Sequence, residues 1–428
     1  MRGRLNIFQR TMIQWDALHP YNAIHVVKIP VAFDAARLRD VLAATLQTLG
    51  LTGLGMDRRG GRFEYRGGAA ACELTVIAAG EQALAEEVAR QLNQPFAPAE
   101  SFSPFRFFVA PEDGCFRLGL VYFHAVADAE SIVRLLRAIV RAYAEGDVAA
   151  GGALERHPPP PPSLLLRQPG LFLRKLLALP ALIRDMKKSF RPDCRDEDDL
   201  TSGFVFFALT PEQLRGLIAA GKSWGVTVND LFLAVLLKGF ASLAVTRSPT
   251  EQRLNLSVGC IVNTRKDHGI DSARTFGLYL GSFVVTHAVP AAMPLRGLAE
   301  DVHRITERVK RDRIYLAASV EMALASVVLA CFSPARRKNV YRKNYPLWGG
   351  ITNLNLNPLW PSSEAPSPLD YFRAVSTGPV TPVVLSATTV GGAVNLGVSY
   401  RTSFFMAAEI EQLKKVFLEQ VEQISSGA

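Results

Sequence analysis

The chain has 428 residues, 49% of them hydrophobic and 20% charged, and a formal net charge of +9. A chain of this length exceeds what one hydrophobic core usually organises, so two domains of about 200 residues each are expected. The high apolar content and modest charge indicate a globular protein with an ample core.

The cysteines argue against a zinc protein, and the N-terminus argues against a secreted or membrane-anchored one. The five cysteines are scattered without a Cys-x-x-Cys pair, which predicts free thiols in a reducing compartment and no zinc site. The first 20 residues have a basic start but no continuous apolar run, so neither a signal peptide nor an anchor is predicted. A cytoplasmic location is expected.

The first half of the chain predicts a mixed sheet covered by helices. Alternating and helical apolar spacing predicts strands at residues 23–30, 62–65, 73–77, 105–109 and 116–124, and helices at 34–49, 82–92 and after Asp128. Strands outnumber helices and do not alternate with them regularly, so a doubly wound parallel sheet is not expected. No glycine-rich phosphate loop follows a strand, which argues against dinucleotide and P-loop enzymes.

A turn between the last strand and the last helix of this half holds His124 and Asp128 in the pattern His-x-x-x-Asp. Asp128 is placed to cap the helix and Gly146 to end it. The pattern puts the side chain that exchanges protons near neutral pH beside a carboxylate. A buried histidine is often an ordinary core residue, however, and an aspartate that opens a helix is usually a cap. These residues alone leave a catalytic and a structural interpretation open.

A spacer separates the two halves. Gly151, Gly152 and the proline run 158–162 predict a stiff connection that cannot join the interior of a sheet. We therefore expect an N-terminal half over residues 1–150, a Pro-rich linker with a basic amphipathic segment over 151–200, and a C-terminal half over 201–428.

The basic amphipathic segment covers residues 164–191 and is interrupted by Pro169, Gly170 and Pro180. It suits a phosphate-bearing ligand, an acidic carrier protein or an anionic membrane surface, and it also fits an ordinary solvated helix face. Its longest uncharged stretch, 176–183, is too short to cross a bilayer. No basic array interleaved with aromatic residues indicates nucleic-acid binding. The segment contains one acid, Asp185, and the following basic residues: Arg167, Arg174, Lys175, Arg184, Lys187, Lys188 and Arg191.

The second half predicts a similar mixture of elements. Strands are expected at 204–209, 254–262, 278–287, 350–356, 380–390 and 393–400, and helices from Thr210-Pro211, at 229–245, 295–313, 320–329 and 407–424. Gly391-Gly392 lies between two alternating runs and predicts a hairpin. The acidic run 196–199 is expected to be exposed.

Several segments, in this order, resemble the superfamily of chloramphenicol acetyltransferase, which includes nonribosomal-peptide condensation domains, wax-ester synthases and alcohol acyltransferases. Residues 123–129, FHAVADA, are similar to the motif His-His-x-x-x-Asp-Gly, with the second His and the Asp kept as His124 and Asp128. The resemblance covers nearly the full length. The other similar segments are the opening stretch 8–46, a Pro-rich stretch at 94–106, the Asn-Asp helix 228–241, an Asn-x-Arg strand at 257–267, the start of a crossover at 350–358, and the last strand and helix at 398–417.

This resemblance implies two similar α/β halves with mixed sheets and a tunnel between them, with His124 midway along it. The implied reaction moves an acyl group from a thioester, either acyl-CoA or an acyl carrier protein, to the hydroxyl or amine of a small-molecule acceptor. His124 would be the general base. No bound cofactor, no metal and no acyl-enzyme are expected, and the chain is expected to be freestanding and monomeric.

The same resemblance assigns the supporting residues. Asp128 would pair with Arg265 and hold the turn so that the imidazole points into the tunnel. Oxyanion stabilisation would come from the second half, where the candidates are Ser386, Thr388, Thr352 and Asn353. Each of these four also fits an ordinary strand hydroxyl or turn amide.

The chain departs from the family pattern at three positions. Phe123 replaces the first His of the motif, and Ala129 replaces the glycine after Asp128, where a Cβ is expected to narrow the turn or shift the helix start. Asn355 stands where relatives often have glycine. Ala129 and Asn355 motivate an alternative function, a catalytically inactive binding or scaffold protein of the same fold. A peripheral membrane contact through residues 164–191 is a further hypothesis.

Overall fold

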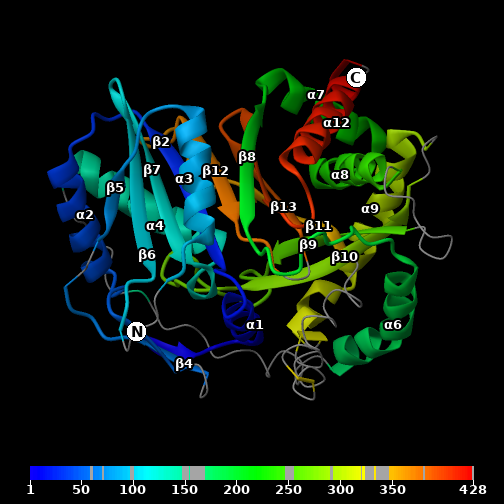
Figure 1. The fold of residues 1–428 in the computed structure, drawn as a ribbon, viewed down its shortest axis with the longest axis horizontal. Coiled ribbons are helices and arrows are strands. Elements are labelled where there is room, and N and C mark those ends of the chain that lie inside the picture. Colours follow the sequence, from blue (N-terminus) through cyan, green and yellow to red (C-terminus); the bar gives the residue numbers. More distant parts are fainter. Residues whose placement is uncertain are drawn as a thin grey trace.

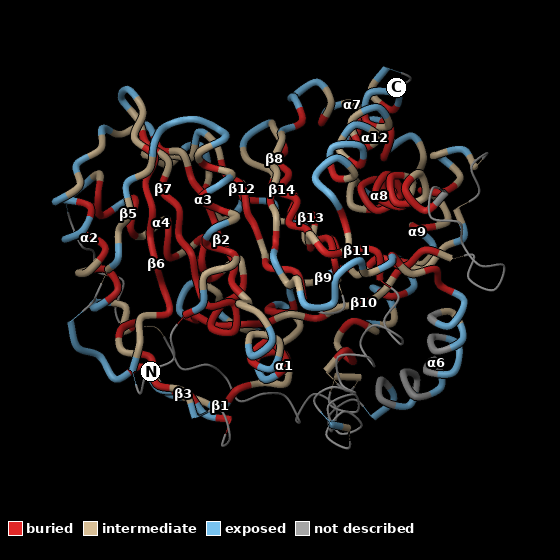
Figure 2. Tube along the Cα trace, in the orientation of Figure 1, coloured by how far each residue is buried: buried red, intermediate tan, exposed pale blue. Residues whose placement is uncertain are grey.

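The computed structural model describes residues 1–57, 61–69, 72–96, 101–146, 154, 169–245, 255–289, 293–319, 321–322, 332–333, 347–378 and 381–426. Two helix-covered sheets lie side by side, with the elements of the first half on the left of Figure 1 and those of the second half on the right. The buried residues follow the strands of both sheets and the helix α8 (Val228–Val245), as Figure 2 shows. Each half therefore has its own core.

The sheet of the first half has five strands in the order β12-β2-β7-β6-β5. It is mixed, as predicted, because β5 pairs with β6 in parallel and the other pairs are antiparallel. The strands are β2 (Asn22–Ile29), β5 (Leu74–Val76), β6 (Phe105–Glu112), β7 (Cys115–Phe123) and β12 (Asp370–Val375).

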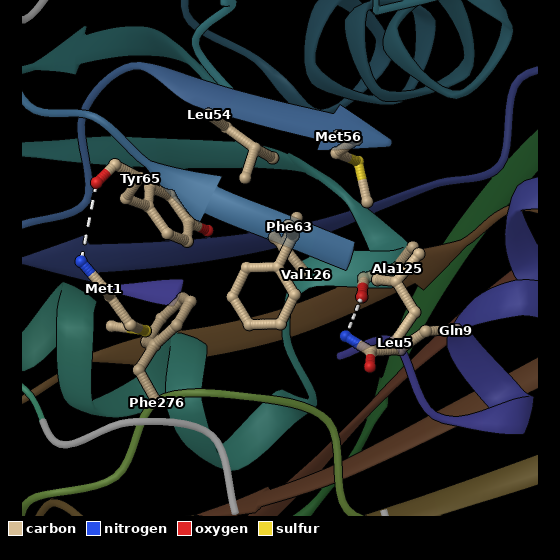
Figure 3. Close-up of a pocket in the computed structure, with 10 residues that line it drawn as sticks. All are labelled: Met1, Leu5, Gln9, Leu54, Met56, Phe63, Tyr65, Ala125, Val126 and Phe276. Atoms are coloured by element: carbon tan, nitrogen blue, oxygen red, sulfur yellow. Dashed lines mark hydrogen bonds between the residues drawn. The ribbon is translucent and has the colours of Figure 1, made fainter. Parts of the chain in front are cut away.

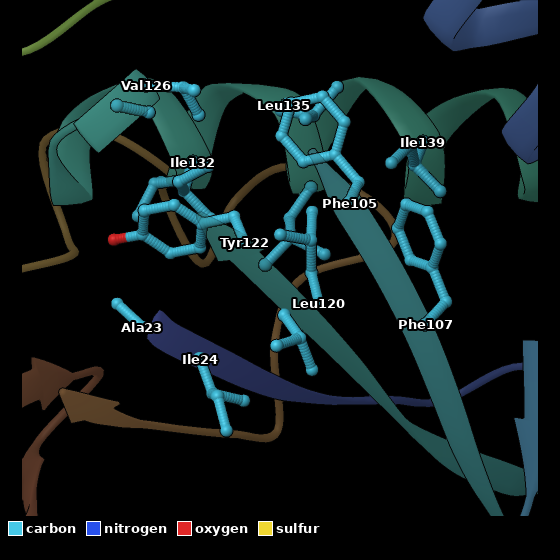
Figure 4. Close-up of a cluster of buried hydrophobic side chains, with 14 of the residues drawn as sticks. Ala23, Ile24, Phe105, Phe107, Leu120, Tyr122, Val126, Ile132, Leu135 and Ile139 are labelled. Carbon is cyan, nitrogen blue, oxygen red and sulfur yellow. The ribbon is translucent and has the colours of Figure 1, made fainter. Parts of the chain in front are cut away.

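Helix α4 (Ala129–Glu145) covers one face of this sheet, and its apolar spacing explains why. Ile132, Leu135 and Ile139 recur at helical spacing and are at most 2% exposed. In Figure 4 they face Leu120 of β7 and the phenylalanines of β6. Strand β7 is buried on both faces from Leu118 onward.

Two further helices flank the sheet. Helix α2 (Ala35–Thr48) packs on α4, and the carboxylate of Asp34, the residue before it, caps its first turn. Helix α3 (Glu81–Asn93) lies between the two halves, because it packs against β2 and also against β8 (Ser202–Leu209). Asn93 both donates to and accepts from the backbone of Ser202, at 2.8 Å in each case.

The sheet of the second half has six strands in the order β10-β9-β11-β13-β14-β8. The predicted hairpin at Gly391-Gly392 is confirmed, since Val390 of β13 pairs with Ala393 of β14. The remaining strands and helices are β9 (Asn255–Asn263), β10 (Leu280–Ala288), β11 (Leu347–Asn355), β13 (Val383–Val390), β14 (Ala393–Arg401), α7 (Pro211–Trp224), α9 (Leu295–Arg311) and α12 (Ala407–Ser426).

Strand β12 connects the two sheets. The chain leaves the second sheet after β11, adds β12 to the edge of the first sheet with Phe372 opposite Val26, and returns as β13. This is the crossover that the resemblance placed near residues 350–358. The strand itself was not predicted, because its six residues, DYFRAV, have an arginine where an apolar residue would continue the pattern.

A helix and two strands near the N-terminus were also missed, whereas the strand predicted at residues 62–65 is present as β4 (Arg62–Tyr65). Helix α1 (Ile7–Asp16) begins with a capping box in which Asn6 and Gln9 each accept from the other's backbone. A helix of ten residues is too short to show a clear helical period of apolar residues. The spacing of Asn6 and Gln9, which is typical of a capping box, could have predicted its start. A sheet of β1 (Arg2–Arg4), β4 (Arg62–Tyr65) and β3 (Leu54–Asp57) lies beside it.

The basic segment forms a helix, α6 (Pro169–Lys188), at the lower right of Figure 1. The expectation that Pro180 interrupts the helix was wrong. Pro169 occupies the first turn, where its missing N–H has no intrahelical partner, and Pro180 is carried inside the helix between good helix formers. Leu173 and Leu177 of this helix are 56% and 71% exposed.

Some of the predicted features lie outside the described residues. The proline run 158–162, most of the helix 320–329 and Cys331 lie outside them, and the four described cysteines are free thiols. No single described helix is long and apolar enough to span a membrane, and α7 with α8 pass that test only as a pair bent by 102°.

A glycine on β14 permits the close approach of β12. A Cβ at Gly397 would overlap the carbonyl oxygen of Arg373. We expect Gly397→Ala to lower the free energy of unfolding by about 1–3 kcal/mol, because the backbones of β12 and β14 must separate. Urea unfolding measures this. Gly297→Ala on α9, where a Cβ meets nothing within 4 Å, is the control and should not destabilise the protein. Equal stability of the two variants would contradict the prediction.

Candidate functional site

The turn that carries His124 is held from two sides. Strand β7 ends at Phe123, and residues His124–Val126 form one 3-10 turn before Asp128 begins α4. The backbone N–H of His124 donates to the carbonyl of Tyr21 at 3.1 Å. The side chain of Gln9 on α1 donates to the carbonyl of Ala125 at 2.8 Å, as Figure 3 shows. Helix α1 and the residue before β2 therefore fix the turn.

His124 is buried between two aromatic rings. Its side chain is 8% exposed, its imidazole stacks on Tyr21 with centroids 5.6 Å apart, and Tyr122 meets it edge-on at 5.6 Å. Nδ1 lies 3.3 Å from the carbonyl oxygen of Ala127. Because a carbonyl only accepts, Nδ1 carries the hydrogen and Nε2 keeps a free lone pair.

The burial of His124 keeps the imidazole neutral. Removal from water lowers its pKa from 6.5 to about 4, and the charge of Arg373 acts in the same direction. The Ala127 carbonyl and the carboxylate of Asp128 oppose this shift, because both favour the imidazolium. At neutral pH the ring can therefore accept a proton at Nε2.

Asp128 and Arg265 form the buried ion pair that the resemblance implied. Each side chain is 2% exposed. Nη2 of Arg265 lies 2.9 Å from Oδ1 of Asp128, and Nε lies 3.2 Å from Oδ2. Asp128 also caps α4 by accepting from Ser131 N at 2.9 Å, and it accepts from Tyr279 N at 3.1 Å. The carboxylate thus ties the turn to the loop after β9 of the other half.

The remaining donors of Arg265 complete this contact. Nη2 donates to Ser131 Oγ at 2.6 Å, Nη1 donates to the carbonyl of Thr275 at 3.1 Å, and the guanidinium lies 4.6 Å from the centre of the Tyr279 ring. A fully hydrogen-bonded pair of this kind offsets the desolvation of both charges. Helix α4 begins at Ala129, directly after Asp128, and Ala129 does not have a positive φ, so its backbone conformation does not require glycine.

The structure brings three of the four oxyanion candidates together. Thr352 on β11 pairs in register with Ser386 on β13, and Thr388 shares the face of Ser386. Asn353 is exposed and points to the opposite side of β11 from Thr352. The hydroxyl of Ser386 is buried and, among the described residues, has no hydrogen-bond partner.

Arg373 on β12 is a site residue that the sequence did not reveal. It is 2% exposed, and its guanidinium donates to Thr388 Oγ1 at 2.9 Å, to the Thr352 carbonyl at 3.0 Å and to the Ala387 carbonyl at 2.7 Å. Burial lowers its pKa to about 10, so it remains a cation. The crossover thus places a positive charge close enough to His124 to influence its protonation.

His25 on β2 extends the buried polar cluster. Its Nδ1 lies 2.6 Å from the hydroxyl of Tyr371, and its ring meets Tyr122 edge-on at 5.7 Å. Burial lowers the pKa of His25 well below its ordinary value, with Arg373 and His124 acting in the same direction. A histidine within an apolar strand gave no sequence signal beyond an ordinary core position.

Two pockets lie near the turn. One of about 710 Å³, including space open to solvent, is lined by Trp15 and by Tyr21, which stacks on His124. The other, of about 250 Å³, is lined by Ala125 and Val126 (Figure 3). A continuous tunnel through His124 stays a prediction. Within the described ranges, no group of His, Cys, Asp and Glu side chains could hold a metal ion.

The buried ion pair makes a prediction for stability. We expect Asp128→Asn and Arg265→Met each to lower the free energy of unfolding by about 3–5 kcal/mol, because each leaves an unpaired buried charge. The double variant should lose less than the sum of the two. Urea unfolding of all three, with Arg296→Met of an exposed pair as control, tests this. Additive losses would contradict the coupling.

The low pKa of His124 makes a prediction for pH dependence. His124 binds a proton near pH 6.5 in the unfolded chain but only near pH 4 in the folded protein. The stability that the protein has with a neutral His124 is therefore fully present above pH 6.5 and decreases as the pH falls toward 4. Between pH 7.5 and 5 the wild type should lose about 2 kcal/mol more stability than His124→Gln. Urea unfolding at both pH values measures the difference, with His287→Gln as control. An identical pH dependence of wild type and His124→Gln would refute it.

Comparisons with known proteins identify the fold. A scan with models of protein families finds no match, and a search of curated proteins finds no similar sequence. Solved structures do match over nearly the whole chain, at low sequence identity. The condensation domain of the monacolin K polyketide synthase MokA matches with a TM-score of 0.67 and 12% identity, covering 100% of this chain and 98% of that one.

Two other structures agree. The first condensation domain of the calcium-dependent antibiotic synthetase, in complex with a substrate analogue, has a TM-score of 0.68 and 15% identity over 99% of this chain and 96% of that one. Polyketide synthase associated protein 5 from Mycobacterium tuberculosis has a TM-score of 0.65 and 14% identity, over 100% and 99%. This chain therefore has the α/β fold of condensation domains.

Proposed function

We propose that this protein transfers an acyl group from a thioester to a hydroxyl or amine acceptor, with His124 as the general base. The observation that carries the proposal is the protonation and orientation of the His124 imidazole. The ring is neutral, its Nδ1–H faces the Ala127 carbonyl, and Nε2 is left as the proton acceptor. The turn that presents it is fixed by the buried pair of Asp128 and Arg265.

The proposed reaction balances without a covalent enzyme intermediate. Nε2 of His124 accepts the proton of the acceptor O–H or N–H while that oxygen or nitrogen attacks the thioester carbonyl carbon. The carbonyl electrons move to the oxygen and give a tetrahedral oxyanion. When they return, the carbon–sulfur bond breaks, and the thiolate leaves and takes the proton from the imidazolium. The products are an ester or amide and a free thiol.

Ser386 is the first choice among the oxyanion candidates. Its hydroxyl lacks a described partner, whereas the oxygens of Thr352 and Thr388 accept from Arg373. Ser386 lies next to Ala387, whose carbonyl accepts from the same arginine. The cation of Arg373 favours the negative charge that develops on the thioester oxygen. Asn353 is exposed and supports no such role.

The donor is proposed to be acyl-CoA or an acyl carrier protein, taken as co-substrate with no resident cofactor. Helix α6 supports this, because Arg184, Lys187 and Lys188 are exposed on it. Cations there suit the phosphates of CoA or the acidic surface of a carrier. The exposed Leu173 and Leu177 on the same helix keep contact with a lipid surface as a further hypothesis.

A second candidate function is binding without catalysis. It is favoured by the packing of His124, which is only 8% exposed with Tyr21 stacked on it and Tyr122 against its edge. A protein of this kind would bind acceptor or thioester and never consume the thioester.

Thiol release separates the two functions. We expect a panel of acyl-CoA and carrier-bound thioesters, mixed with alcohol and amine acceptors, to release thiol only when an acceptor is present. His124→Ala should lower the rate about 10²- to 10⁴-fold, because the proton acceptor is lost. His287→Gln, whose ring pairs with Asp301 on α9, is the control and should keep the wild-type rate.

Two outcomes count against catalysis by His124. Unchanged turnover in His124→Ala would remove the general base from the proposal. Thioester binding without thiol release, for every donor and acceptor tried, would favour the binding protein.

A further inference from the structure

Helix α6 lies at the rim of the molecule, and its end is fixed to the sheet of the second half (Figure 1). Ser189, directly after the helix, is buried, and its Oγ lies 2.6 Å from Oγ of Ser257 on β9. The backbone N–H of Phe190 donates to the carbonyl of Asn255 at 2.7 Å, and the indole N–H of Trp348 on β11 donates to the carbonyl of Phe190 at 3.1 Å. The helix is therefore presented from a firm attachment.

The exposed residues of α6 lie on one stripe. Beyond the first two residues of the helix, those that the structure describes as exposed follow one another at intervals of three or four positions, which places them on one side of a helix. A helix of this length extends over about 30 Å. Figure 2 shows α6 at the edge of the molecule, with its described residues mostly exposed. The residues of the stripe are Leu173, Leu177, Pro180, Ala181, Arg184, Lys187 and Lys188.

The first half of the stripe is apolar and open to water. The side chains of Leu173 and Leu177 are 56% and 71% exposed, and Leu177 is the most exposed of the large apolar side chains that the structure describes. Pro180 and Ala181 continue the row. A single exposed leucine needs no explanation, but two leucines one turn apart, extended by two further apolar residues, form a continuous apolar ridge.

The second half of the stripe is cationic. Arg184, Lys187 and Lys188 are exposed there, and the one acid of the helix, Asp185, is partly exposed beside Arg184 at 3.6 Å. The 3-10 turn Ile314–Ala317 packs against α6 and follows the basic last turn of α9. The cations of α6 thus belong to a larger basic region, which attracts an anionic surface.

The combination of an apolar and a cationic half fits a lipid bilayer better than a soluble anion or a protein. A phosphate-bearing ligand would use the cations and leave the leucines in water. Protein interfaces are enriched in aromatic residues and depleted in lysine, whereas the described stripe has two lysines and neither an aromatic nor a neutral polar side chain. An anionic bilayer serves both halves, because its headgroups carry phosphate and its acyl chains accept leucine.

We propose that α6 attaches this protein to the surface of an anionic lipid bilayer. Because the stripe runs along one side of the helix, α6 would lie in the plane of the interface, with Leu173 and Leu177 at the boundary between headgroups and acyl chains. Arg184, Lys187 and Lys188 would contact the lipid phosphates. This attachment goes beyond the proposed function and does not depend on catalysis by His124.

Flotation of the full chain with vesicles tests the requirement for charge. Vesicles of phosphatidylcholine alone are compared with vesicles that also contain phosphatidylglycerol, at low and at high salt. We expect binding to the anionic vesicles to be about tenfold tighter than to the neutral ones, and high salt to weaken it severalfold. Lys187→Glu with Lys188→Glu should lower binding to anionic vesicles about tenfold. Lys222→Glu with Lys415→Glu, which makes the same change in net charge at exposed positions of α7 and α12, is the matched control and should bind as the wild type does.

The leucines are tested in the same assay. Leu173→Ser with Leu177→Ser should weaken binding to anionic vesicles about tenfold, because the inserted apolar surface is lost. The matched control is Leu369→Ser with Met406→Ser, at positions that are 57% and 56% exposed elsewhere on the molecule. A second readout is fluorescence: anionic vesicles should shift the tryptophan emission of Leu177→Trp to shorter wavelength, and Leu369→Trp should respond only as the wild type does.

The outcomes distinguish lipid from the other occupants. Equal binding to neutral and anionic vesicles, or no binding to either, would overturn the attachment. Wild-type binding of the leucine variant together with weak binding of the lysine variant would also overturn it, because charge alone would then suffice. In that case a raised KM of the lysine variant for acyl-CoA would favour CoA as the occupant, and one raised only for a carrier-bound thioester would favour an acidic carrier.

The attachment and the proposed function can fail separately. Vesicle binding as expected, without thiol release from any donor, would uphold the attachment and overturn the function. Thiol release that requires His124, in a protein that binds no vesicles, would uphold the function and overturn the attachment.

Discussion

The buried ion pair between Asp128 and Arg265 is the constraint on which the site depends. Two charges that are each 2% exposed persist only because every donor of the guanidinium is close to an acceptor and the carboxylate accepts from the backbone as well. The same carboxylate starts α4 and so fixes where the turn ends. The position of the imidazole is therefore set by a contact between the halves, while the imidazole itself takes no part in that contact.

The crossover strand gives the second connection, and it changes the electrostatics of the first sheet. β12 places Arg373 opposite His25 of β2, and oxygens of β11 and β13 accept hydrogen bonds from this buried cation, which offsets the cost of burying it. The cation lowers the proton affinity of His25 and His124 and favours negative charge nearby. The proposed function requires a neutral base and a stabilised oxyanion, and Arg373 would contribute to both.

The sequence predicts the site best where local pattern and motif coincide. The change from strand to helical period around His124 and Asp128 located the turn, and the resemblance supplied Arg265, whose pairing no local rule could predict. The sequence did not reveal Arg373, His25 or the pocket wall at Trp15, because each depends on contacts between distant segments. The alternation of β11 places Asn353, one of the oxyanion candidates, on the opposite face from Thr352, where it is exposed. Pro180 was given too much weight against the surrounding helix formers of α6.

The pairing of β12 with β2 also affects how the chain is made. β2 lies within the first 29 residues, and the strand that covers its edge ends at Val375. During synthesis the first sheet must therefore wait, with an apolar edge unpaired, until almost the entire chain has left the ribosome. An uncovered edge strand is a template for pairing with other chains. Nascent chains and C-terminal truncations of this protein carry an aggregation hazard that the finished fold removes.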